Sequence, residues 1–485
     1  MKKGFDHDKY IEKQSKEIKD RLKLFDKLYL EVGGKLFSDT HAERVLPGFK
    51  SDAKIDILKK LKKDIEIIFC IKASDIEKNK TRAEYGVTYD TEILNLINIS
   101  RKHGFDVNSV VITLFNNEES VTKFIKKLEI QNIKTYIHTA TKGYPSDVNT
   151  IVSREGYGAN PYIKTTKKII ILSAPGASSG KLATCLSQLY HDNKKGINAG
   201  YAKFETFPVW NLPLKHPVNL AYEAASANVN DYNLIDPYHL ENYDVQAVNY
   251  NRDVDSFPIL KTILNRIWGE DIYLSPTATS INVIKDCIID MDIVNESSKK
   301  EIVRRYYQEQ ANYKLGLNDN EPLTKVKLLL NELEIDEYYL KTIKPALKKS
   351  ELEKRHVISL ELPNGKVITG KQTDLLSPAS TLIINAIKEL TKIPDEINLL
   401  SPSVLEPILK LRREEKELSL QEVLIALSIC SVTNPIIETA LDNINKLKNC
   451  DAHSTYIIQN GDLRTLKNLG INLTCEPEFY SNKVY

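Results

Sequence analysis

The first third of the chain alternates between two patterns of apolar positions, which together predict a sheet with helices between its strands. Short continuous runs of β-branched and aliphatic residues indicate buried strands, whereas apolar residues spaced three or four apart indicate amphipathic helices. Strands are expected at residues 65–71, 108–115, 134–139 and 169–172, and helices at residues 90–103 and 118–128. This order is typical of βαβ units and a mostly parallel sheet.

The regions outside this alternating part show other patterns. Residues 8–30 predict one long, charged amphipathic helix ahead of the sheet. Residues 201–258 combine Asn, Asp and Pro with many aromatic residues, which predicts ordered loops around short helices. Helical patterns dominate from there to about residue 349, and the charge-dense residues 344–355 indicate a domain boundary.

The last part of the chain predicts a second α/β domain. A hairpin is expected to turn at Pro363-Asn364-Gly365, because this tripeptide separates two apolar, β-branched runs. Helices are expected at residues 379–390, 402–413 and 421–430, and a strand at residues 454–459.

The chain has 485 residues, which is more than one hydrophobic core usually supports. We therefore predict a multidomain α/β protein with three parts. Residues 1–258 are expected to form an α/β phosphate-binding domain with an N-terminal helix and a mostly parallel sheet. Residues 259–350 are expected to form a helical middle segment, and residues 351–485 a smaller C-terminal α/β domain.

Residues 167–192, K-K-I-I-I-L-S-A-P-G-A-S-S-G-K-L-A-T-C-L-S-Q-L-Y-H-D, carry the clearest sign of a ligand. A predicted strand leads into a loop of small residues and then into an amphipathic helix. A helix N-terminus in this setting directs backbone N–H groups and a positive dipole end at an anion. We expect this loop to bind a phosphate-bearing ligand through Gly176, Ala177, Ser178, Ser179, Gly180 and Lys181.

The loop departs from the standard phosphate loop G-x-x-x-x-G-K-[ST] at two positions. Pro175 takes the place of the first glycine, and Leu182 takes the place of the hydroxyl that binds magnesium. Thr184 cannot replace that hydroxyl, because it lies roughly 200° around the helix from position 182. The alternative is a strand-to-helix turn whose small residues merely allow close packing.

Composition argues against several classes of partner. Lys and Arg number 67 against 65 for Asp and Glu, so the net charge of +2 gives no reason to expect nucleic acid or an anionic membrane. No apolar run reaches the roughly 20 residues of a spanning helix, and no apolar signal segment follows Met1. The six cysteines include no C-x-x-C pair, which suits reduced thiols in the cytoplasm.

A polar segment near the N-terminus offers residues for catalysis. His41 and Arg44 lie between Gly34 and Pro47, where the hydrophobic pattern shows little regular periodicity. Arg44 offers a two-pronged contact to phosphate or carboxylate, and His41 offers an acid or base near neutral pH. The structural alternative is that His41 caps a turn and that Arg44 pairs with a neighbouring carboxylate.

Residues 201–258 hold the densest group of titratable side chains in the chain. Asp231, Asp236 and Asp253 are expected to hold Mg²⁺, which would compensate for the missing hydroxyl at position 182. Arg252 is expected to stabilise charge in the transition state. A zinc site built from His216 and His239 is a weaker alternative, and hydrogen bonds that merely order the loops are the structural one.

Two further polar groups are weaker candidates. His191 and Asp192 end the helix that starts at Lys181, roughly 15 Å from the loop, so they cannot contact the same phosphate. Asp451, His453 and Ser454 have the composition of a serine-hydrolase triad, but no G-x-S-x-G motif surrounds the serine.

Four longer phrases carry a family resemblance. They are G-G-K-L-F-x-D-x-H-A-x-R-V-L-P-G-F at residues 33–49, L-A-T-C-L-S-Q-L-Y-H-D at 182–192, the segment 204–223, and D-A-H-S-T at 451–455. By these phrases the chain resembles a conserved bacterial family of unknown function (domain of unknown function 1846, uncharacterised protein family UPF0371). The resemblance covers essentially the whole chain and implies a multidomain α/β architecture. It implies no reaction, substrate or catalytic residue.

The residues favour an enzyme that binds a nucleotide or another phosphorylated metabolite and acts on a phosphoryl or related group. One alternative is a non-catalytic ligand-binding or assembly protein that forms homo-oligomers through its C-terminal domain. A weaker alternative is a metal-dependent hydrolase.

Overall fold

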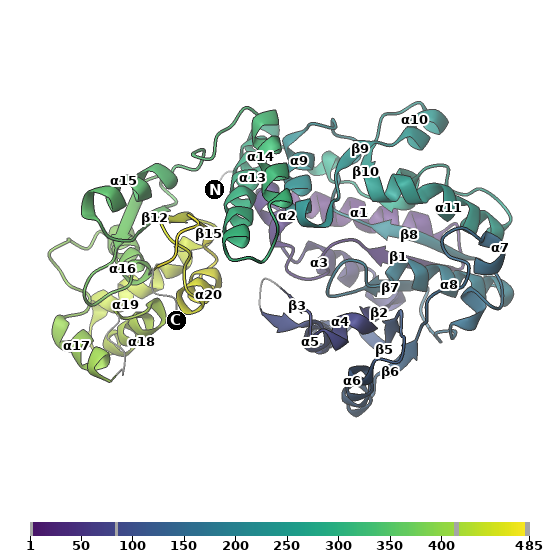
Figure 1. Ribbon diagram of the computed structural model, residues 1–485, viewed down its shortest axis with the longest axis horizontal. Helices are drawn as coiled ribbons and strands as arrows, with labels where there is room; N and C mark the ends of the chain where they lie inside the picture. Colours follow the sequence, from purple (N-terminus) through teal and green to yellow (C-terminus); the bar gives the residue numbers. More distant parts are fainter. Residues whose placement is uncertain (1–2, 83–85, 412–416, 481–485) are drawn as a thin grey trace. The chain divides into compact units, whose positions relative to one another are not determined.

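The computed structural model describes residues 3–82, 86–411 and 417–480 (Figure 1). These residues fall into two compact units, each with its own sheet. The N-terminal unit comprises residues 3–223 and 231–295, and the C-terminal unit comprises residues 224–230 and the described residues from 296 to 480.

Seven parallel strands form the main sheet of the N-terminal unit. They are β1 (Lys27–Val32), β2 (Ile65–Lys72), β5 (Asp106–Thr113), β6 (Lys134–Ile137), β7 (Ile169–Ser173), β8 (Ala199–Phe204) and β11 (Ser280–Ile281). Their order across the sheet is β11-β8-β1-β7-β2-β5-β6, and every neighbouring pair is parallel. The prediction of an α/β fold with a mostly parallel sheet is confirmed.

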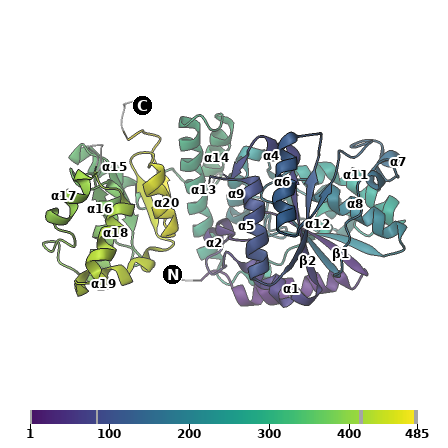
Figure 2. The ribbon, with the colours of Figure 1, turned by 90° about the horizontal axis from the view of Figure 1, so that it is seen from below.

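Helices cover both faces of this sheet (Figure 2). One face packs against α8 (Lys181–Lys194) and α11 (Asn251–Trp268), and its buried side chains include Tyr29, Ile170 and Leu172. The helices α4 (Ala73–Glu77), α5 (Tyr89–Lys102) and α6 (Glu119–Ile130) pack on β2, β5 and β6. Successive strand residues point to opposite faces, so the apolar runs of β2 and β7 fill both cores.

The remaining elements of the N-terminal unit connect or flank the strands. They are α1 (His7–Leu22), α2 (Thr40–Val45), α3 (Ala53–Lys60), β3 (Thr81–Arg82), β4 (Val87–Thr88), α7 (Val148–Ile151), α9 (Pro217–Ala225), β9 (Asn233–Ile235), α10 (Pro237–Tyr243), β10 (Val248–Tyr250) and α12 (Pro276–Thr279).

The prediction of one helix over residues 8–30 is wrong. The helix α1 ends at Leu22, and residues 27–32 form β1, an interior strand of the sheet between β8 and β7. Leu28, Tyr29 and Leu30 are all fully buried, because β1 is covered on both faces. A short apolar run of this kind also fits a helical stripe, so periodicity alone could not separate the two structures.

The C-terminal unit contains a mixed four-stranded sheet and several helices. Its strands are β12 (Val357–Glu361), β13 (Val367–Lys371), β14 (Asp451–Ser454) and β15 (Asn472–Cys475), in the order β13-β12-β14-β15. Its helices are α14 (Glu321–Glu332), α15 (Ile343–Glu353), α16 (Pro378–Thr391), α17 (Pro402–Lys410), α18 (Leu420–Ser431), α19 (Pro435–Asp442) and α20 (Asn460–Asn468), together with most of α13 (Met291–Lys314).

The predicted hairpin is confirmed, because β12 and β13 pair antiparallel around residues 362–366. The predicted strand at 454–459 is wrong, since β14 begins earlier and ends at Ser454. Residues 412–413, the end of the helix predicted at 402–413, lie outside the described residues. None of the described helices is both long and apolar enough to cross a bilayer.

Candidate functional site

The candidate site lies where the chain leaves the neighbouring strands β1 and β8. After β1 the chain continues to β2 on one side of it, and after β8 it continues to β11 on the other side. In open parallel sheets, ligands bind in the crevice that such divergent connections leave at the carboxyl ends of the strands. The side chains at this edge are therefore the first to examine.

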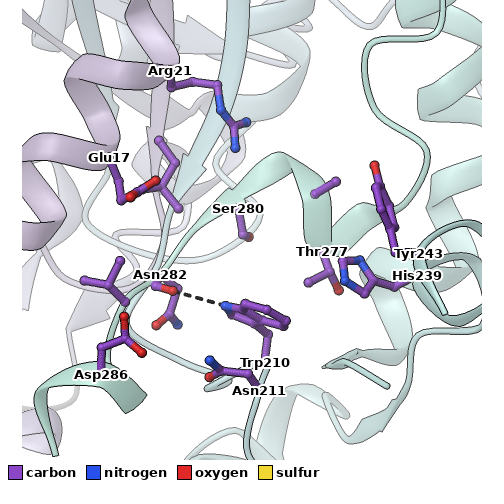
Figure 3. Close-up of a pocket in the computed structure, with 13 residues that line it drawn as sticks. Glu17, Arg21, Trp210, Asn211, His239, Tyr243, Thr277, Ser280, Asn282 and Asp286 are labelled. Atoms are coloured by element: carbon purple, nitrogen blue, oxygen red, sulfur yellow. Dashed lines mark hydrogen bonds between the residues drawn. The ribbon is translucent and has the colours of Figure 1, made fainter. Parts of the chain in front are cut away.

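A cavity of about 430 Å³ opens beside β11 at this edge (Figure 3). Ser280 and Ile281 line it, and they pair with Lys203 and Phe204 at the carboxyl end of β8. A much smaller cavity shares Ser280 with it and is also lined by Glu205. The two cavities also share Trp210, Thr277 and Asn282, so Glu205 adjoins the main cavity through the smaller one.

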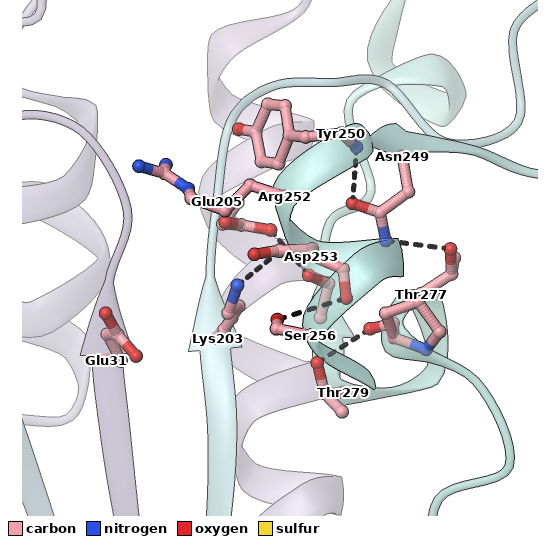
Figure 4. Close-up of polar contacts among 12 residues, drawn as sticks. Glu31, Lys203, Glu205, Asn249, Tyr250, Arg252, Asp253, Ser256, Thr277 and Thr279 are labelled. Atoms are coloured by element: carbon pink, nitrogen blue, oxygen red, sulfur yellow. Dashed lines mark hydrogen bonds and ion pairs between the residues drawn. The ribbon is translucent and has the colours of Figure 1, made fainter. Parts of the chain in front are cut away.

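A group of largely buried charged residues, here named the strand-end cluster, follows the same edge, and Figure 4 labels its members other than Lys181. It consists of Glu31, Lys181, Lys203, Glu205 and Asp253. Lys203 pairs with Asp253, and the Lys181 ammonium lies 4.0 Å from a Glu31 carboxylate oxygen. No side chain of these two pairs is more than 14% exposed.

Glu205 has the most perturbed carboxyl group of this cluster. Burial raises its pKa to about 7 against the lowering effect of Lys203, and the charge of Asp253 adds to the rise. The Ser280 hydroxyl donates a hydrogen bond of 2.6 Å to the carboxylate. A carboxyl group with such a pKa suits general acid–base catalysis near neutral pH.

Two neighbours shape the environment of Glu205. Gly33 leaves room for it, because a Cβ atom at this glycine would lie 2.7 Å from the Glu205 Cγ. Although burial lowers the pKa of Lys203, the charges of Asp253, Glu205 and Glu31 raise it above the ordinary value. Lys203 therefore stays a cation in the middle of the cluster.

The predicted phosphate loop connects β7 to α8, as expected, but packing accounts for its glycines. Gly180 has a φ of +82°, and a Cβ there would lie 2.8 Å from the Thr113 side chain. The Thr113 hydroxyl also donates a 2.7 Å hydrogen bond to the carbonyl of Ser179. A Cβ at Gly176 would collide with the Tyr89 hydroxyl. The glycines alone therefore do not distinguish a phosphate site from close packing.

Two other features of this loop favour an anion. Gly180 occupies the N-terminal capping position of α8, so this position provides no side chain to cap the helix. Ser179 is 4% exposed, and its hydroxyl has no hydrogen-bond partner among the described residues. A buried polar group without a partner is costly unless a ligand or water satisfies it. Phosphate binding here remains a prediction.

The structure places His41 at the border of the strand-end cluster. Its ring packs edge-on against Phe207 and Tyr222, at centroid distances of 5.3 and 5.9 Å. Tyr222 in turn lies 5.6 Å from the ring of Tyr250, which flanks the cluster. Arg44 lies on the same short helix, α2, and is half-buried.

The three predicted metal ligands do not form one group. Asp253 pairs with Lys203, and Asp231 forms an ion pair of 3.0 Å with Arg252. Asp236 is fully buried and caps α10, and it also accepts hydrogen bonds from the backbone and hydroxyl of Thr277. Among the described residues, no three His, Cys, Asp or Glu side chains are arranged to hold a metal ion.

The weaker candidates have structural partners. Asp192 accepts hydrogen bonds from Lys27 and from two tyrosine hydroxyls at the amino end of the sheet. The Ser454 hydroxyl donates to the carbonyl of Tyr456, whereas His453 contacts Thr474 and Glu476. The serine-hydrolase arrangement is therefore not formed.

Sequence reasoning missed Glu31, Lys203 and Glu205. Each lies at the carboxyl end of a buried strand, in the phrases K-L-Y-L-E-V and A-K-F-E. Charged residues at the end of an apolar run were the available signal. Glu31 was missed because residues 8–30 were wrongly predicted to form a helix. Lys203 and Glu205 were missed because loops were expected from residue 201 onwards.

Comparison with known proteins covers nearly the whole chain. The family model "Domain of unknown function DUF1846, N-terminal" matches residues 3–334, and "Domain of unknown function DUF1846, C-terminal" matches residues 339–485. A UPF0371 protein of Clostridium tetani (strain Massachusetts / E88) is 51% identical over 499 aligned positions, which cover 100% of this chain and 99% of the relative. A UPF0371 protein of Clostridium botulinum (strain Alaska E43 / Type E3) is also 51% identical with the same coverage.

Proposed function

The chain belongs to the DUF1846 family, and we propose that it is an enzyme acting on a nucleotide or another phosphorylated metabolite. The ligand binds across the carboxyl ends of β7, β1 and β8, and the enzyme transfers or cleaves a phosphoryl or related group. We place the protein in the cytoplasm, in keeping with six cysteines that are all free.

One observation carries this proposal. The 14-residue helix α8 begins with Lys181, a member of the strand-end cluster, and its capping position is a glycine. The buried hydroxyl of Ser179 just before it has no hydrogen-bond partner within the part of the chain that the structure describes. The helix end supplies N–H donors and a positive dipole for an anion. The cluster supplies cations and a carboxyl group whose pKa is close to neutral.

The residues divide the work as follows. Lys181 and Lys203 neutralise phosphate charge, and Glu205 exchanges a proton with the reacting group. Arg252 and Arg44 contact the end of the ligand that reacts, and His41 donates or accepts a proton there. A Mg²⁺ ion that binds together with a nucleotide would be held by the carboxylate of Asp253 and not by those of Asp231 and Asp236.

A thermal-shift screen of nucleotides and phosphorylated metabolites, with and without Mg²⁺, tests the proposal. A ligand at 100 times its Kd stabilises the folded protein by about 2.7 kcal/mol. Lys181→Ala should abolish the ligand-induced rise in Tm, whereas Lys194→Ala should retain it. The control residue is exposed at the other end of α8, roughly 20 Å away.

Ser179→Ala sharpens the screen. Removing a buried hydroxyl without a partner should leave the unliganded Tm unchanged or raise it, since no hydrogen bond is lost. The same variant should weaken the ligand-induced shift. Equal shifts in the parent, Ser179→Ala and Lys181→Ala would contradict the phosphate site.

A specific surface also favours association of two copies through the C-terminal unit. Ile425 and Ile429 on α18, Val432 just after it and Ile436 on α19 are between 44% and 84% exposed. No charged residue occurs from residue 423 to 437, so two copies meeting there across a two-fold axis would not repel. Sedimentation of the parent and of Ile429→Asp tests this, and a parent that stays monomeric at high concentration would contradict it.

A further inference from the structure

The cavity beside β11 has features that the proposed phosphate site does not explain. Three aromatic rings form one side of it (Figure 3): Trp210 lies 5.7 Å from His239, and His239 lies 4.7 Å from Tyr243. The indole N–H of Trp210 donates to the carbonyl of Asn282, which fixes the ring at the cavity wall. Aromatic faces of this kind stack on the rings of a ligand.

The polar side chains of the cavity suit a neutral ligand with hydrogen-bond donors. Glu17 and Asp286 bring two carboxylates to the lining, of which Asp286 is paired with Lys13 at 2.8 Å, and Arg21 is the one Lys or Arg among the described residues that line it. Arg21 already donates to the Tyr273 hydroxyl, at 2.9 Å. The lining therefore has no excess of positive charge with which to hold a phosphate, but it has acceptors for amino and hydroxyl groups.

The position of the cavity sets the length of a ligand that fills it and also reaches the phosphate loop. Between β11, where Ser280 lines the cavity, and β7, which leads into the loop, lie β8 and β1. Three inter-strand spacings amount to roughly 14 Å. A nucleoside that carries a phosphate chain spans such a distance, whereas a hexose phosphate does not.

We infer that this cavity binds the nucleoside portion of a nucleotide whose phosphates extend along the strand ends to the N-terminus of α8. The inference rests on the proposed function and narrows its ligand from phosphorylated metabolites in general to nucleotides. The base stacks on Trp210 and Tyr243, and the amino groups of the base and the hydroxyl groups of the ribose face Glu17 and Asn282. Lys203 and Glu205 lie between the two ends and so face the phosphate chain.

The chain offers a direct optical test, because it contains only two tryptophans, Trp210 and Trp268. Trp268 donates to the carbonyl of Ala199 at the amino end of β8, away from the cavity. In the Trp268→Phe variant, emission excited at the red edge of the indole band reports on Trp210 alone. The four common ribonucleoside triphosphates, inorganic triphosphate and glucose 6-phosphate are titrated against this variant, with Tm measured in parallel.

At least one ribonucleoside triphosphate should change the Trp210 emission and reach saturation, while inorganic triphosphate raises Tm without that change. Tyr243→Ala should weaken nucleotide binding about tenfold, the typical loss for one base–aromatic stack, and leave triphosphate binding unchanged. Tyr232→Ala is the matched control, because Tyr232 is 52% exposed and does not line the cavity.

The possible failures are distinguishable. If inorganic triphosphate raises Tm but no nucleotide changes the Trp210 emission, the inference is wrong and the proposed function stands. A change of emission with glucose 6-phosphate as large as that with a nucleotide would also overturn the nucleoside assignment. If no phosphorylated compound raises Tm, the proposed function fails and this inference fails with it.

Discussion

Two largely buried lysine–aspartate pairs lie at opposite ends of the same sheet, and only one has the surroundings of a site. At the amino end of β1, Lys27 lies 3.0 Å from the Asp192 carboxylate, which is fully buried. The hydroxyls of Tyr29 and Tyr162 donate to the same carboxylate, at 2.7 and 2.8 Å. One cation and two neutral donors thus satisfy one anion.

At the carboxyl end of β8, Lys203 pairs with Asp253 among further negative charges. Burial lowers the pKa of Lys203, but Asp253, Glu205 and Glu31 raise it above its ordinary value. Burial raises the pKa of Glu205 itself to about 7. This pair therefore carries an excess of carboxylates next to a helix N-terminus and a cavity. The comparison shows that a buried ion pair does not itself indicate a site. An excess of carboxylates over cations at the carboxyl edge of a parallel sheet does.

The largest expected effect is a difference in stability between variants that lack the lysine of one pair or of the other. Lys203→Met leaves Asp253 and Glu205 without their shared cation and should lower the free energy of unfolding of the N-terminal unit by about 3–5 kcal/mol at pH 8. Lys27→Met should cost less, about 2 kcal/mol, because two tyrosine hydroxyls still bond Asp192. Chemical denaturation measures both, and equal losses would show that the two ends do not differ.

The next effect depends on pH and concerns Glu205. Its folded-state pKa lies above the ordinary 4.5, so its stabilising contribution is complete below about pH 4.5 and is lost as the pH rises through about 7. Glu205→Gln stays neutral and should gain stability relative to the parent across this interval. A difference in unfolding free energy that does not change with pH would contradict the raised pKa.

A smaller effect is expected when the predicted metal ligands are replaced, and it differs between Asp236 and Asp253. Asp236→Asn removes charge from the cap of α10 and should cost about 1 kcal/mol of stability without changing any Mg²⁺ dependence of ligand binding. Asp253→Asn should reduce that dependence, because this carboxylate lies in the strand-end cluster. Calorimetric titration of the ligand with and without Mg²⁺ measures this dependence. If Asp236→Asn reduced it and Asp253→Asn did not, the ion would not be bound at the strand-end cluster.

The smallest expected change in stability concerns Arg44. Arg44→Lys keeps the charge and should change the unfolding free energy by no more than about 0.5 kcal/mol. Turnover of a phosphorylated substrate should fall at the same time, since an ammonium cannot reproduce a planar two-pronged contact. A variant with parental turnover would return α2 to a structural role.

The sequence predicted the strands and helices of residues 65–194 well, because their apolar periodicities are unambiguous. It could not predict β1 as a strand, since Lys27–Val32 also continues the apolar stripe of α1, and only burial on both faces separates the two structures. The loop before α8 was found from its residue types alone.

The partners of that loop could not be found in this way. Glu31 and Lys203 are distant in the chain and meet only because β8 pairs with β1 across the sheet. Asp253 was found as a candidate ligand, but its pairing with Lys203 depends on where α11 begins, seven residues before Pro258. Strand order and helix starts are properties that one sequence specifies only weakly.

The most direct test of the account measures the ligand-induced rise in Tm in the two matched variants. With a ribonucleoside triphosphate that stabilises the parent, Lys27→Met should show the full rise above its own lowered Tm, because its pair lies at the amino end of the sheet. Lys203→Met should show no rise, because the cation that faces the phosphate chain is gone. Equal rises in both variants, or a loss confined to Lys27→Met, would contradict a phosphate site at the carboxyl ends of these strands.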